Sequence, residues 1–87
     1  MSASRFYQEA WLAIAKEGGW LTAREVVELL PSGMELDDFH TRLWCMSRRQ
    51  GYLAHRGEAK QSEYAVTPGC IAPSGLTVRQ IAEALNP

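Results

Sequence analysis

The feature that most restricts the fold is a capping box that joins Thr22 to Glu25, because it fixes where one helix must begin. The threonine hydroxyl can accept a hydrogen bond from the amide of Glu25, and the carboxylate of Glu25 can accept one from the threonine amide. Pro31 and Gly33 follow closely, and both residue types interrupt helices. The sequence therefore predicts a short helix over 23–30, with a different element on each side.

Similar start and stop signals place the other elements. In chain order we expect a helix over 4–17, a short extended piece at 20–21, the helix 23–30, a helix over 35–50, strands over 52–56 and 63–67, and a helix over 77–85 that opens with a second capping box at Thr77 and Gln80. The helix over 35–50 has one apolar ridge, formed by Leu36, Phe39, Leu43 and Met46. Two short strands around a loop that contains Gly57 predict a hairpin. The predicted fold class is α+β and mostly helical.

Length and composition exclude several classes of protein. The 87 residues suffice for one domain, and a hydrophobic fraction of 46% argues against wholesale disorder. The longest apolar runs fall far short of the roughly 20 residues that cross a bilayer, and no secretory signal opens the chain. Cys45 and Cys70 are too few for a disulfide framework. We therefore expect reduced thiols in a cytoplasmic protein with no membrane partner.

The formal net charge of −1 conceals an uneven distribution. Segment 40–60 contains five Lys and Arg residues and one acid, Glu58, which gives +4, whereas the rest of the chain carries −5. Local potential, more than the total, steers a polyanion, so the basic centre favours a nucleic-acid partner. The alternative is that these cations form an ordinary solvated face.

Three groups of residues resemble a winged helix-turn-helix domain, the small fold of many bacterial and phage repressors. They are Leu21-Thr22 at the start of the second helix, Leu43-x-x-Met46 followed by Gly51-Tyr52-Leu53, and the segment 64–69, which is similar to the strand that ends many wings. The resemblance implies a three-helix bundle with a two- to three-stranded β-wing over 1–69. Residues 70–87 then form a linker and a C-terminal helix.

The resemblance further implies that helix 35–50 lies with its outward side in the major groove of DNA and that the wing 52–67 reaches the adjacent backbone or minor groove. Arginine can pair bidentately with guanine, and wing cations position phosphates. The expected DNA-binding residues are Thr41, Arg42, Arg48, Arg49, His55, Arg56 and Lys60. Asp37 and Asp38 suit the start of a helix but repel phosphate.

We therefore expect a sequence-specific DNA-binding protein, a small transcriptional regulator of phage or bacterial type. Its partner is double-stranded DNA, and we expect a homodimer because one such module offers only a small DNA interface. The expected protein-contact residues are Leu12, Trp44, Leu76, Ile81 and Leu85.

Trp44 leaves a second hypothesis open, because it lies about a third of a turn off the apolar ridge. Either its indole closes the core against the wing, or it anchors a protein partner. An exposed aromatic beside Asp37 and Asp38 would suit a winged helix that binds protein, as an adaptor or as an inhibitor of a nucleic-acid machine.

The sequence offers no pattern for enzyme chemistry. It contains no Gly-rich phosphate loop and no nucleophile elbow. His40 and Cys45 are five residues apart, a poor match to one helical face, and neither cysteine has a C-x-x-C partner. We therefore expect a binding protein, with no enzymatic activity, no metal and no cofactor.

Overall fold

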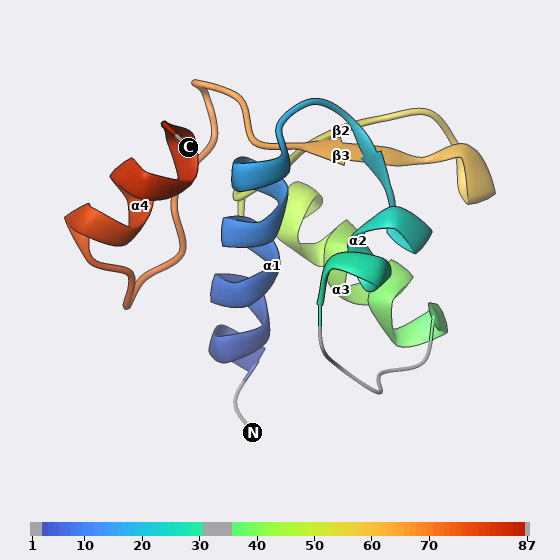
Figure 1. Ribbon diagram of the computed structural model, residues 1–87. Helices are drawn as coiled ribbons and strands as arrows, with labels where there is room; N and C mark the ends of the chain where they lie inside the picture. The colour runs from blue at the N-terminus through green and yellow to red at the C-terminus, as the bar shows by residue number, and fades with distance from the viewer. Residues whose placement is uncertain (1–2, 31–35, 87) are drawn as a thin grey trace.

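The computed structural model describes residues 3–30 and 36–86 of the chain (Figure 1). The elements, in chain order, are α1 (Ala3–Glu17), β1 (Leu21–Thr22), α2 (Ala23–Leu29), α3 (Leu36–Arg48), β2 (Ala54–Arg56), the short 3-10 helix η1 (Ala59–Gln61), β3 (Glu63–Ala65) and α4 (Val78–Leu85). This arrangement confirms the predicted α+β class. None of the described helices is both long enough and apolar enough to cross a membrane.

The capping boxes form as predicted at the starts of α2 and α4. At α2, the amide of Thr22 donates to a carboxylate oxygen of Glu25 at 2.9 Å, and the amide of Glu25 donates to the Thr22 hydroxyl at 3.2 Å. At α4, Thr77 and Gln80 make the same reciprocal pair, at 2.9 and 3.0 Å. Pro31 and Gly33, the predicted stop after α2, lie outside the described residues.

Several boundaries differ from the predicted ones. Helix α1 begins one residue before the expected start at residue 4, and the two hairpin strands span 54–56 and 63–65 only. The strand β2 is short because the amide of Tyr52 donates to the carbonyl of Met46 at 2.8 Å. Tyr52 therefore closes the end of α3 instead of joining the sheet.

The three strands form one antiparallel sheet in the order β1-β3-β2. The middle strand is β3, where Tyr64 pairs with Leu21 of β1 on one side and with His55 of β2 on the other. The sheet therefore fixes the hairpin to the start of α2 and holds Tyr64 at its centre, where only 2% of the residue is exposed.

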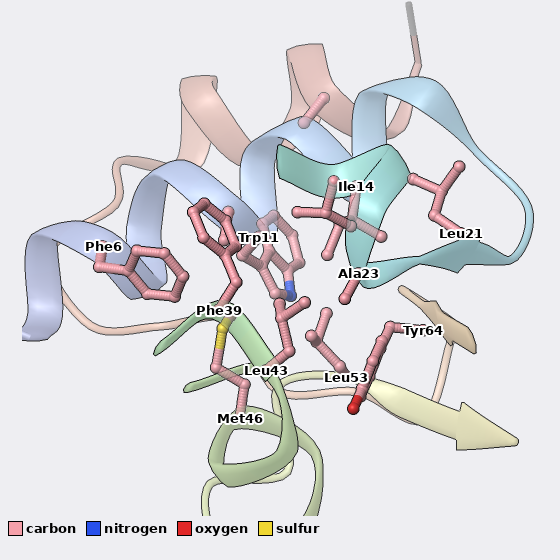
Figure 2. Packing of buried hydrophobic residues seen from close by; sticks show 13 residues of the cluster. Phe6, Trp11, Ile14, Leu21, Ala23, Phe39, Leu43, Met46, Leu53 and Tyr64 are labelled. Atoms are coloured by element: carbon pink, nitrogen blue, oxygen red, sulfur yellow. The ribbon is translucent and has the colours of Figure 1, made fainter. Parts of the chain in front are cut away.

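The core lies where α1, α2 and α3 meet the sheet (Figure 2). Its fully buried side chains include Ile14 of α1, Val26 of α2 and Leu43 of α3. The Phe6 ring meets Phe39 edge to face, with 5.2 Å between the centroids, and the Trp11 indole donates to the carbonyl of Tyr52 at 3.1 Å. Helix α3 is thus held by one side, and its other side faces away from α1.

Helix α4 packs against α1, on the side away from α2 and α3 (Figure 1). The segment before it is tied to the body, because the amide of Ile71 donates to the carbonyl of Gly51 at 2.9 Å and the Gln8 side chain donates to the carbonyl of Ser74 at 2.8 Å. Three of the expected protein-contact residues are partly buried against the chain's own core, namely Leu12, Leu76 and Ile81. Their apolar surface is therefore used largely within the chain.

Candidate functional site

A groove separates α3 from the β2–β3 hairpin and has a volume of about 660 Å³. One wall belongs to α3 and the other to the hairpin with η1. The lining residues are His40, Thr41, Trp44 and Arg48 on α3, and His55, Gly57, Glu58, Ala59, Lys60, Ser62 and Tyr64 on the hairpin side. We call it the α3–hairpin groove.

Helical periodicity gives α3 two different sides. Phe39, Leu43 and Met46 are completely buried, whereas Thr41, Trp44 and Arg48 are exposed or line the groove. The Trp44 residue is 45% exposed. Of the two interpretations of Trp44, the one in which it closes the core is therefore wrong, and its indole forms part of the groove wall.

Two cations line this groove, and a third is adjacent to one of them in the sequence. Arg48 and Lys60 line it from opposite walls, and the exposed Arg49 follows the last residue of α3. Among the side chains that the structure describes, no carboxylate forms an ion pair with any of the three. Their charges therefore remain available to an anionic partner.

Two other expected DNA-binding arginines are engaged within the chain. The guanidinium of Arg42 lies over the ring of Phe6, 5.2 Å from its centroid, and does not line the groove. Arg56 lies 4.4 Å from the centroid of the Trp20 ring, and its Nε donates to Glu63 at 2.9 Å. The sheet register causes this second contact, because Arg56 lies directly opposite Glu63.

His55 and Tyr64 line the groove from the hairpin side. Their rings lie 5.2 Å apart between centroids, and Nε2 of His55 is buried without a hydrogen-bond partner among the described groups. An unpaired buried nitrogen is costly to the folded chain. Burial also raises the pKa of the Tyr64 hydroxyl above its usual value, which keeps the phenol neutral.

The groove brings together four of the seven expected DNA-binding residues, namely Thr41, Arg48, His55 and Lys60. Arg49 is exposed nearby, and the side chains of Asp37 and Asp38 lie outside the described residues. Sequence reasoning missed Ser62 and Tyr64 as parts of this site. Tyr64 lies opposite His55 in the sheet register, a pairing that the sequence spacing did not fix, and Ser62 ends η1 just before β3.

Within the described part of the chain, no three His, Cys, Asp or Glu side chains gather in a way that could hold a metal ion. Comparisons of the chain with protein-family models, with curated proteins and with solved structures find no match. The function proposed below therefore rests on the groove and on its cations.

Proposed function

We propose that this chain is a winged-helix DNA-binding protein that binds double-stranded DNA through α3 and the β2–β3 hairpin, as a small transcriptional regulator. One observation carries the proposal: Arg48 of α3 and Lys60 of the hairpin line the same groove from opposite walls. Cations from two separate elements thus face one space, as the binding of a phosphate backbone requires.

The order of the elements supports the winged-helix assignment. A helix and a short strand are followed by two helices and a hairpin, and the strand β1 joins the hairpin in one sheet. Helix α3 packs by its apolar side and leaves its other side open beside the hairpin. This is the arrangement expected of a recognition helix followed by a wing.

Each cation has a distinct role in this proposal. Arg48 and Arg49, at the end of α3, contact phosphates or guanine edges, and Lys60 contacts the backbone from the hairpin. Arg56 remains 55% exposed in its side chain despite its contact with Glu63, so it adds a weaker contribution. Thr41, exposed on α3, contacts a phosphate or a thymine methyl group.

The proposal includes a homodimer, because one module of this size covers little DNA. Packing against α1 covers much of the apolar surface of α4. Val78 and Leu85 nevertheless remain 85% and 50% exposed. These two residues are the part of α4 that a second copy would cover.

Binding of a mixed-sequence duplex at low salt tests the function. We expect the wild-type chain to bind and the double variant R48A/R49A to bind at least about thirtyfold more weakly. The matched control is R79A, which removes an exposed arginine paired with Glu83 on α4. It should retain nearly wild-type affinity, and absence of duplex binding by the wild-type chain at low salt would contradict the proposal.

The exposure of Trp44 favours a second candidate function, a winged helix that binds protein. A half-exposed tryptophan in a groove is the kind of residue that anchors protein interfaces. This candidate replaces the first if the chain binds no duplex at low salt.

A further inference from the structure

We propose that the α3–hairpin groove holds one unpaired base of a DNA strand, stacked on Trp44, with its flanking phosphates bound by Arg48 and Lys60. The inference rests on the proposed function, because the same cations serve both. It goes further by naming the form of DNA that the groove accepts.

The lining of the groove favours a flat ring. Trp44, which is 45% exposed, lines the groove from α3, and His55 and Tyr64 line it from the hairpin side. Aromatic side chains that are open to solvent on one face stack readily on nucleobases, because every base has a π-face. Inside a duplex both faces of each paired base are covered by its neighbours, so within the strand an unpaired base is the one that can stack on Trp44.

The charges favour a ligand that is negative on two sides. Arg48 and Lys60 lie on opposite walls, and Glu58 is the one carboxylate among the described lining residues. A nucleotide within a strand carries one phosphate before its sugar and one after it. Two cations on facing walls match that pattern better than they match a ligand with a single charge.

Two polar residues, His55 and Ser62, line the hairpin side of the groove. Nε2 of His55 is buried and has no hydrogen-bond partner among the described groups, and the largely buried Ser62 also lines the groove. The volume of about 660 Å³ lies within the range of small-ligand sites and suits a single nucleotide.

Two duplexes of the same sequence test the inference, one fully paired and one with a single bulged 2-aminopurine. We expect the wild-type chain to bind the bulged duplex about tenfold more tightly and to quench the 2-aminopurine fluorescence through stacking. In W44A the ratio of the two affinities should fall to about one and the quenching should be lost, whereas W44F should retain most of both. I71A, which shortens an apolar side chain exposed in the segment before α4 and outside the groove, is the control and should keep the full ratio.

The outcomes separate this inference from the proposed function. Equal wild-type affinities for the two duplexes, or an unchanged ratio in W44A, overturn the base site and leave duplex binding in place. Binding of the bulged duplex without binding of the paired one supports the base site and overturns the duplex function. Absence of binding to either duplex overturns both, and the wild-type comparison holds even if W44A fails to fold.

Discussion

The two sides of α3 differ in almost every physical respect. The core side, formed by Phe39, Leu43 and Met46, is completely buried and holds the helix against the rest of the chain. The groove side, which includes Trp44 and Arg48, is open and lies beside the hairpin that carries Lys60. If the proposed function holds, one helix separates stability from binding, and substitutions on its two sides should affect different measurements.

The largest stability effect should come from Leu43 on the core side. L43A removes a completely buried side chain and leaves a cavity, so we expect the free energy of unfolding to fall by about 2–5 kcal/mol. The matched variant T41A on the groove side should change it by less than about 0.5 kcal/mol. Urea denaturation measures both, and similar losses for the two variants would break the distinction between the sides.

The next effect concerns the start of α2, which packs against α3. T22A removes the hydroxyl that accepts from the amide of Glu25, and we expect a loss of about 1 kcal/mol in the free energy of unfolding. T77A removes the same contact from α4, where Val78 is largely exposed, and should cost less. Equal losses for T22A and T77A in urea denaturation would show that the burial of a helix does not determine how much its N-cap contributes to stability.

Arg42 sharpens the comparison, because it is a cation of α3 that lies on the core side. Its guanidinium lies over the Phe6 ring, so R42A should lower the free energy of unfolding by about 0.5–1 kcal/mol through loss of the cation–π contact. Duplex affinity should fall less in R42A than in R48A. An equal or larger loss of affinity in R42A, measured by fluorescence anisotropy, would place Arg42 in the binding surface.

The smallest effect is expected at Tyr64, which belongs both to the core and to the groove. Burial raises the pKa of Tyr64, so the folded chain holds the phenolic proton more tightly than the unfolded chain does. Its contribution to stability is therefore complete below a pH of about 10 and declines as the pH rises from there towards the raised pKa. Between a pH of about 8 and about 11, the free energy of unfolding should therefore decline less steeply in Y64F than in the wild-type chain. Identical pH profiles of unfolding for Y64F and the wild-type chain would contradict this prediction.

Local signals in the sequence were enough to predict much of the fold. Thr22 and Thr77 start their helices with the predicted boxes, and the apolar spacing of Phe39, Leu43 and Met46 identifies the buried side of α3. These features depend on residues three or four positions apart, whose geometry a helix fixes in advance. The hairpin was also predictable, although its strands are shorter than expected because Tyr52 bonds back to α3.

The site was less predictable, because it depends on contacts between distant residues. The cation–π contact of Arg56 with Trp20 joins two elements far apart in sequence, and its ion pair with Glu63 requires the exact register of the hairpin. The contact between the tilted rings of His55 and Tyr64 depends on the same register. The sequence therefore identified Arg48 and Lys60, the two cations that line the groove. It did not show that Arg42 and Arg56 contact other side chains of the same chain.

The salt dependence of duplex affinity tests the central claim most directly. Each phosphate contact releases counterions, so the slope of log K against log salt counts the cations that contact DNA. We predict that the slope of R48A/R49A is shallower than that of the wild-type chain by about two, while R79A keeps the wild-type slope. Equal slopes for wild type and R48A/R49A, or no duplex binding at low salt, would contradict the claim that the groove side of α3 binds DNA.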